Sequence, residues 1–430
     1  MLSVERVRLG FIFFLGLIWF VNVRIIADVF IAELLLLVAL PFLLIRYGRA
    51  WSNPIVNKII IFGLLWFVSQ MVTDIIRETE LTKLARGWLA ILFFLGNFYA
   101  VYLLIRGDDR RLLALIIGYA LGGILRCFID PGYGFDVEPW KFGFGFPTMI
   151  LALLAITRLI AKGVLKEQVG LGCLLLLGVF SIYLNARSLG GVMVLAVLMV
   201  GLSKSQLFQV IYLVHSNPAK KTGLIALVGM MIFIILVSYR WAGEAKVLPE
   251  NAQYKYDLVE SSSMGAFGVI LAGRSELLAS IPAVADSPFI GHGSWAEDSK
   301  YRLYLYEIGN LIGVERDEIQ VRRVVEEKES IPAHSHLMQS WVWAGFLGAL
   351  FWLFIFRMIV EVTVRSMRYR NYLSMLGVFI CVKSAWDLLF SPFGSTMRMQ
   401  WAWELNLMIL LLMQSYPCSV GNVSAEPKSS

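Results

Sequence analysis

Three short polar segments border apolar runs in this sequence, and they are centred on Arg187, Arg274 and His334. Placing a charged group beside a lipid-facing run costs free energy, so such a group usually marks a functional site. A guanidinium fork binds phosphate oxygens through two hydrogen bonds. An imidazole has a pKa close to the working pH and can accept a proton. Together, these residue types could neutralise an anionic group and remove a proton from a substrate.

The two arginines occupy different settings. Arg187 lies in a tight turn at 185–191, Asn-Ala-Arg-Ser-Leu-Gly-Gly, which joins two apolar runs. Arg274 precedes Ser275, which could cap the helix that follows, and a helix N-terminus favours phosphate. Each arginine also has a simpler interpretation. Arg187 could end a helix and extend to the membrane rim, and Arg274 could be a solvated surface residue.

The third segment, Pro-Ala-His-Ser-His at 332–336, directly precedes an apolar run. Two histidines so spaced could bind a metal, but no carboxylate or cysteine has a recognisable metal spacing, so we expect no metal. His334 is the expected general base, and His336 is a substitute base or a substrate-binding residue. The alternative is an interfacial histidine that only forms hydrogen bonds. Arg398, beside Gln400, is a further candidate for binding an anion.

The composition excludes the soluble protein classes. Of the 430 residues, 58% are hydrophobic and 16% are charged, and the mean hydropathy is +0.71, whereas about 25% of an ordinary soluble domain is charged. A soluble fold has too little interior for so much apolar surface, which predicts a polytopic membrane protein. The sequence contains no Gly-rich nucleotide loop, no Ser/His/Asp set and no pair of catalytic carboxylates, so we expect no cofactor. The four cysteines lack paired spacing and indicate neither disulfides nor zinc.

Apolar runs of about 17–25 residues predict helices that span a membrane. Twelve runs qualify as candidates: 9–26, 29–45, 59–75, 87–105, 112–129, 146–161, 169–185, 189–203, 222–239, 337–357, 372–390 and 400–415. We therefore expect an all-α polytopic membrane protein, with about nine spans in 1–239, three in 337–415 and a cytoplasmic tail at 416–430. The run at 207–215 is too short to span and is interpreted as interfacial. If it did span, the topology after it would invert.

Basic residues in the short loops predict the orientation. With a cytoplasmic N-terminus, nineteen Lys and Arg lie on the cytoplasmic side and seven in the opposite short loops. Both termini are then cytoplasmic, and the loop at 240–336 is extracytoplasmic. This loop has fifteen acidic and ten basic residues, a net charge of −5. Its stretch of helical spacing predicts that it folds against the membrane helices: Leu277, Leu278, Ile281 and Val284.

The polar segments consequently share the extracytoplasmic face. The chain as a whole has a net charge of +7, although this loop is negative. Most of the excess positive charge lies in the predicted cytoplasmic loops, where basic residues determine the orientation in the membrane. We therefore expect no nucleic acid partner.

The segment at His334 resembles a known motif. His334-Ser335, nine further residues and Gly345-Phe346-Leu347-Gly348 fit the pattern of the bacterial O-antigen ligases. The related O-antigen and exopolysaccharide polymerases have similar signatures. The segment at Arg187 resembles the family's arginine before a small-residue helix. The Gly-Arg pair at Arg274, followed by Ser-Pro-Phe-Ile-Gly-His-Gly at 287–293, resembles the family's Gly-Arg helix and its Pro-x-x-Gly-x-Gly turn. These motifs cover roughly 180–350 in the family's order.

This resemblance implies a glycosyltransferase of the bacterial inner membrane, with a GT-C-like helical fold and no need for metal or nucleotide. Its donor would be a glycan on polyprenyl diphosphate, and an acceptor sugar hydroxyl would attack the anomeric carbon at the periplasmic face. Arg187 and Arg274 would bind the diphosphate, and His334 would be the base. Arg398 and His336 are additional substrate-binding candidates. The second histidine leaves the choice of base open.

Three functions fit these features. The first is a polymerase that joins repeat units of an O-antigen, capsule or exopolysaccharide, with a flippase and a chain-length regulator as candidate protein partners. The second is an O-antigen ligase, whose lipid A-core acceptor is rich in phosphate and suits a negative loop poorly. The third is a secondary transporter or flippase for lipid-linked oligosaccharides. A transporter should have polar residues near the bilayer midplane, whereas we expect them at one face.

Overall fold

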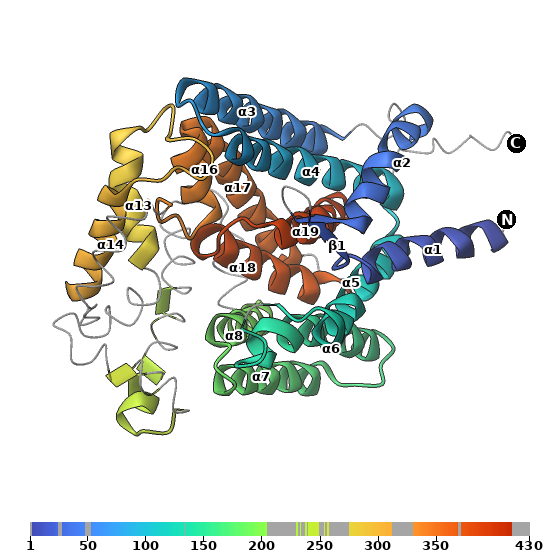
Figure 1. Ribbon diagram of the computed structural model, residues 1–430. Helices are drawn as coiled ribbons and strands as arrows, with labels where there is room; N and C mark the ends of the chain where they lie inside the picture. Colours follow the sequence, from blue (N-terminus) through green and yellow to red (C-terminus); the bar gives the residue numbers. More distant parts are fainter. Residues whose placement is uncertain are drawn as a thin grey trace, which may run out of the picture.

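The computed structural model describes residues 2–24, 28–47, 53–132, 134–203, 240–248, 275–311, 330–368 and 371–414, and a few further positions between 229 and 257. The helices are α1 (Leu2–Leu17), α2 (Ile31–Tyr47), α3 (Pro54–Ile76), α4 (Leu81–Ile105), α5 (Asp109–Ile129), the π-turn η1 (Trp140–Phe144), α6 (Gly145–Ala161), α7 (Glu167–Tyr183), α8 (Arg187–Leu202), α13 (Ser275–Asp286), α14 (Ser299–Leu311), α16 (His336–Ala344), α17 (Phe346–Arg368), α18 (Ser374–Phe390) and α19 (Ser395–Gln414). A small antiparallel hairpin, β1 (Asn22–Arg24) and β2 (Asp28–Phe30), interrupts them. The predicted all-α class is therefore confirmed (Figure 1).

Five of these helices are long and apolar enough to cross a membrane: α3, α4, α5, η1 together with α6, and α17. Two shorter helices, α7 and α8, are also apolar. These helices support a membrane protein. The number of twelve spans stays a prediction, because most of the predicted span at 222–239 lies outside the described residues. The interfacial segment at 207–215 and the tail at 416–430 lie outside them as well.

Two predicted spans need correction. The run at 9–26 is helical only up to Leu17, because the chain then turns into the hairpin, where Val23 pairs with Val29. The run at 337–357 is broken at Gly345 into α16 and α17. Gly345 has a φ of +69°, a left-handed conformation that side chains disfavour, and its N–H closes the last turn of α16 on Trp341.

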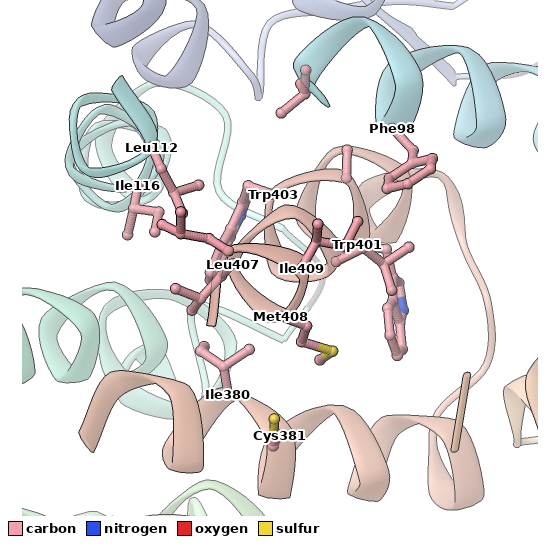
Figure 2. Close-up of a cluster of buried hydrophobic side chains, with 14 of the residues drawn as sticks. Phe98, Leu112, Ile116, Ile380, Cys381, Trp401, Trp403, Leu407, Met408 and Ile409 are labelled. Atoms are coloured by element: carbon pink, nitrogen blue, oxygen red, sulfur yellow. The ribbon is translucent and has the colours of Figure 1, made fainter. Parts of the chain in front are cut away.

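Helix α19 is the centre of the bundle. Every residue from Arg398 to Leu412 is buried. Figure 2 shows side chains of α4, α5 and α18 around it, among them Phe98, Leu112 and Ile380. A helix that is buried on all sides requires neighbours on all sides, and α4, α5, α17 and α18 supply them.

The helices α13 and α14 lie at one end of the bundle, opposite the end where α1 begins (Figure 1). Both come from the predicted extracytoplasmic loop. A small apolar cluster, made of Ala283, Tyr301, Ile331 and Val342, joins them to α16. The described part of the loop therefore packs on the helices, as its helical spacing predicts.

Candidate active site

His334 and Glu276 join two of the three polar segments. The Nδ1 atom of His334 lies 2.9 Å from Oε2 of Glu276. Glu276 lies in the first turn of α13, two residues after Arg274, and His334 precedes α16. The side chains of His334 and Glu276 are 45% and 40% exposed, so a substrate in solution can reach the pair.

This geometry suits a general base. When Nδ1 faces a carboxylate, the neutral imidazole carries its proton there and leaves the lone pair of Nε2 free. The carboxylate also stabilises the imidazolium ion that forms when Nε2 takes a proton, as in other carboxylate–histidine pairs. His334 is therefore oriented to accept a proton through Nε2, with Glu276 as its orienting partner.

The turn at 287–293 connects α13 to α16. His292 N donates to Val342 O at 2.7 Å, and Gly293 N donates to Trp343 O at 3.1 Å. Gly291 has a φ of +85°, and a Cβ atom there would lie 2.7 Å from Gly345 N. Glycine is needed at 291 both for its conformation and for this close approach. The two glycine-containing motifs of the sequence thus form one contact.

Polar residues of α3 hold the same turn from the other side. Asp74 is 1% exposed and accepts hydrogen bonds from Ser294 N at 2.6 Å and from Trp88 Nε1 at 2.9 Å. Arg77 donates through Nε to Gly291 O at 3.0 Å and through Nη2 to Ser287 Oγ at 2.9 Å. These bonds fix the end of α13, and so the helix that carries Glu276.

These α3 residues are not among those predicted from the sequence, although their spacing could have indicated them. Gln70, Thr73, Asp74 and Arg77 follow the spacing i, i+3, i+4 and i+7, which places them on one face of an apolar helix. A polar stripe in such a helix indicates a polar partner, here the turn at 287–293. Glu276 follows Arg274 by two residues, but its pairing with His334 joins residues far apart in the chain and is not evident from the sequence.

His336 has a different environment from His334. It is fully buried, and Trp401 Nε1 donates to its Nε2 at 2.8 Å. Its Nδ1 therefore carries the proton and donates to Ser391 O at 2.6 Å. Both nitrogens are occupied, so His336 anchors the start of α16. This arrangement favours His334 as the base.

Ser335 strengthens the same anchor. Its Oγ caps α16 by accepting from Met338 N at 3.2 Å, and it donates to Leu388 O at 2.9 Å. The histidine segment is thus attached to the end of α18 through two consecutive residues, Ser335 and His336.

Arg187 begins α8, next to Asn185, whose side chain donates to Glu138. Helix α8 packs on α7 and α18, and α16 also packs on α18. Helix α18 therefore lies between the helix that begins with Arg187 and the one that follows His334 (Figure 1). Arg274, the other arginine predicted to bind the diphosphate, lies outside the described residues.

Arg398 has a partner inside the bundle. It is 3% exposed, and its guanidinium forms two hydrogen bonds with Glu33, Nε to Oε1 at 2.8 Å and Nη2 to Oε2 at 2.7 Å. Asn97 Nδ2 also donates to Glu33, at 2.8 Å. A substrate anion would have to displace a buried carboxylate from Arg398, which is costly. In the structure Arg398 therefore pairs with Glu33, and not with the substrate anion that the sequence predicts.

Within the described ranges, no three residues of the His, Cys, Asp or Glu type are grouped so that they could hold a metal ion. Cys127, Cys173 and Cys381 are free thiols. No protein-family model matches the chain, and no curated protein matches it. The geometry of the helices and of the His334 pair is therefore the basis for inferring a function.

Proposed function

We propose that this protein is a glycosyltransferase of the bacterial inner membrane, which transfers a glycan from polyprenyl diphosphate to an acceptor sugar hydroxyl. The observation that carries the proposal is the Glu276–His334 pair, 2.9 Å apart and accessible to solvent. It coincides with the histidine of the ligase-like motif. It also lies at the end of the bundle that the basic residues predict to be periplasmic.

The proposed reaction requires one proton transfer. Nε2 of His334 takes the proton of the acceptor hydroxyl, while the oxygen forms a bond to the anomeric carbon of the donor. The bond from that carbon to the diphosphate breaks, and its electron pair leaves with the diphosphate. Diphosphate is already a good leaving group, so neutralising its growing charge is the other requirement. Arg187 and Arg274 are our candidates for this role.

Among enzymes of this kind we favour a polymerase of O-antigen or exopolysaccharide repeat units. The net charge of −5 in the loop 240–336 supports this choice over an O-antigen ligase, because a lipid A-core acceptor brings further negative charge. A ligase remains the alternative within the same chemistry.

The proposal can be tested in a deletion strain that is rescued with variants. His334→Ala should abolish glycan transfer at an unchanged protein level. Glu361→Gln is a matched control, because Glu361 forms only a surface pair with Arg365 on α17. Polymer of normal length and yield with His334→Ala would contradict the assignment of the base.

The glycans that the deletion strain produces separate the candidate functions. Single repeat units on the lipid core indicate a lost polymerase. Bare core together with accumulated lipid-linked polymer indicates a lost ligase. Lipid-linked repeat units that stay on the cytoplasmic leaflet indicate a lost flippase.

A transporter of lipid-linked oligosaccharides is the second candidate, and one observation favours it. Lys383 and Glu404 are buried well inside α18 and α19, and the buried Asp387 lies in the last turn of α18. Ionisable residues inside a helical bundle are typical of transporters. The leaflet on which lipid-linked repeats accumulate distinguishes this candidate from both enzymes.

A further inference from the structure

Three ionisable side chains meet inside the bundle, away from the His334 pair. Lys383 and Asp387 lie one turn apart on α18, and Glu404 faces them from α19. Lys383 Nζ donates to Asp387 Oδ2 and lies 3.4 Å from Glu404 Oε1. Glu404 is fully buried, and the other two are less than 10% exposed. Figure 2 shows the same interface of α18 and α19, where Ile380 and Cys381 face α19.

Neutral groups complete the surroundings of Glu404. Ser384 Oγ lies 3.0 Å from Oε2, and Gln400 Nε2 donates to Oε1 at 2.8 Å. Gln400 Oε1 in turn faces the hydroxyl of Tyr119 on α5, at 3.4 Å. The aromatic ring of Phe146 on α6 faces Lys383, with 4.7 Å between Nζ and the ring centroid.

The other titratable groups nearby add no compensating charge at Glu404. Tyr119 and Cys381 are neutral acids in their ordinary form. His336 is neutral, because one of its nitrogens accepts a hydrogen bond from Trp401. Arg126 faces the ring of Trp19, 5.6 Å from its centroid, and lies two turns beyond Tyr119 on α5, about 10 Å along the helix.

The charges of this cluster do not balance unless it holds a proton. Lys383 supplies one positive charge, whereas Asp387 and Glu404 would supply two negative charges. An uncompensated charge in a buried site costs several kcal/mol, and proteins usually avoid it by neutralising one group. Asp387 is the better partner for Lys383, because Lys383 Nζ makes its shorter contact with Asp387, and Glu404 is the more completely buried of the two carboxyls.

We propose that the interface of α18 and α19 is a proton-binding site, in which Glu404 carries a proton beside the Lys383–Asp387 ion pair. The carboxylic acid would donate from Oε2 to Ser384 Oγ, since a hydroxyl can accept as well as donate. The site is then neutral, Gln400 still donates to Glu404 Oε1, and the bond between Ser384 and Glu404 reverses its direction. This proposal does not rest on glycan transfer.

A hydrogen-bonded path connects the site to the surface. Ser391, at the end of α18, is only partly buried and donates to Asp387. Asp387 in turn contacts Lys383, and Lys383 contacts Glu404. A proton from water can therefore exchange with Glu404 through these groups. The carbonyl of Ser391 also accepts from His336, so the proton site is linked to the segment that carries His334.

Infrared spectroscopy of the full chain in lipid bilayers tests the proposal at neutral pH. The wild type should show the carbonyl band of a protonated carboxyl, and the band should shift in D₂O. Glu404→Gln should remove it. Asp387→Asn should remove it as well, because Glu404 then becomes the single carboxylate beside Lys383 and ionises. Glu361→Gln is the matched surface control and should leave the band unchanged.

Lys383→Met gives the opposite change. The band should grow about twofold, because neither carboxyl then has a cation to balance it. Adding Asp387→Asn to Lys383→Met leaves protonated Glu404 alone, and its band should match that of the wild type. In Lys383→Met/Glu404→Gln the single carboxyl left in the cluster is Asp387. If the wild-type band matches the band of this variant instead, the assignment of the proton to Glu404 is wrong. A wild type without the band, or a band that survives Glu404→Gln, would overturn the proton site itself.

Discussion

The two charged pairs Glu276–His334 and Glu33–Arg398 differ mainly in their access to water. Nearly half of each side chain in the first pair is exposed, whereas Glu33 and Arg398 are almost completely buried. An exposed pair contributes little to stability and can change protons and partners freely. A buried pair is fixed, since separating it leaves a charge without solvent. Of these two pairs, the exposed one is therefore suited to proton transfer, and the buried one holds helices together.

The largest effect is expected from breaking the buried pair. Arg398→Met should destabilise the protein by about 3–5 kcal/mol, because Glu33 is then left buried without its partner. Thermal unfolding in detergent should detect the loss, and the double variant Arg398→Met/Glu33→Gln should recover much of it. Glu361→Gln, which breaks the exposed pair with Arg365, is the control and should have little effect. An Arg398→Met protein of normal stability that no longer transfers glycan would instead support the role in anion binding.

Replacing the exposed histidine should affect the reaction and leave stability unchanged. His334→Ala should slow glycan transfer about 10²–10⁴-fold, the usual contribution of a general base. His336→Ala should instead lower the melting temperature, because the hydrogen bonds to Ser391 and Trp401 are lost. Rates and melting curves of the two purified variants provide the comparison. If only His336→Ala abolishes transfer and remains fully stable, the base is His336.

A smaller effect on the reaction is expected for the orienting carboxylate. Glu276→Gln retains a hydrogen-bond acceptor beside His334 Nδ1 but removes the negative charge that stabilises the imidazolium ion. Transfer should fall by less than it does in His334→Ala, and the rate should become less sensitive to salt. The kinetic constants distinguish this role from a structural one: kcat should fall in Glu276→Gln while KM stays the same. An unchanged kcat would mean that Glu276 does not act through His334.

The smallest effect concerns the exposed ion pair that links α13 and α14. Lys300 Nζ lies 2.6 Å from Asp286 Oδ2, and hydrogen bonds from Lys300 and Tyr301 hold the pKa of Asp286 below its usual value. A carboxyl with a lowered pKa stabilises the folded state above its unfolded pKa, about 3.9. This contribution is lost as the pH falls through the folded pKa. Melting temperatures of wild type and Asp286→Asn should therefore differ slightly at pH 6 and converge in acid.

Much of the fold could be predicted because lipid-compatible helices are continuous apolar runs. The runs at 59–75, 87–105 and 169–185 agree with α3, α4 and α7 to within a few residues. Local conformation limited the prediction elsewhere. An apolar pattern does not reveal that Gly345 has a positive φ and divides a run into two helices, or that the chain turns into a hairpin after α1.

The candidate site was predictable in part for a related reason. His334 could be selected because its residue type and spacing are unusual beside an apolar run. Its partner Glu276, and the pairing of Glu33 with Arg398, depend on contacts between distant parts of the chain. Burial also separates His334 from His336, although the two are only two residues apart. Spacing along the chain carries no information about that difference.

The attachment of Ser335 and His336 to the end of α18 has a consequence for the order of synthesis. Their partners, Leu388 and Ser391, are translated more than fifty residues later, and Trp401 follows them. While the ribosome makes α16 and α17, the histidine segment is held only from one side, by Glu276 and by the turn at 287–293. The bonds to the end of α18 and to Trp401 form only after the last two helices have been made, so a chain that stops short of α19 contains every proposed catalytic residue and still lacks part of the frame that positions them.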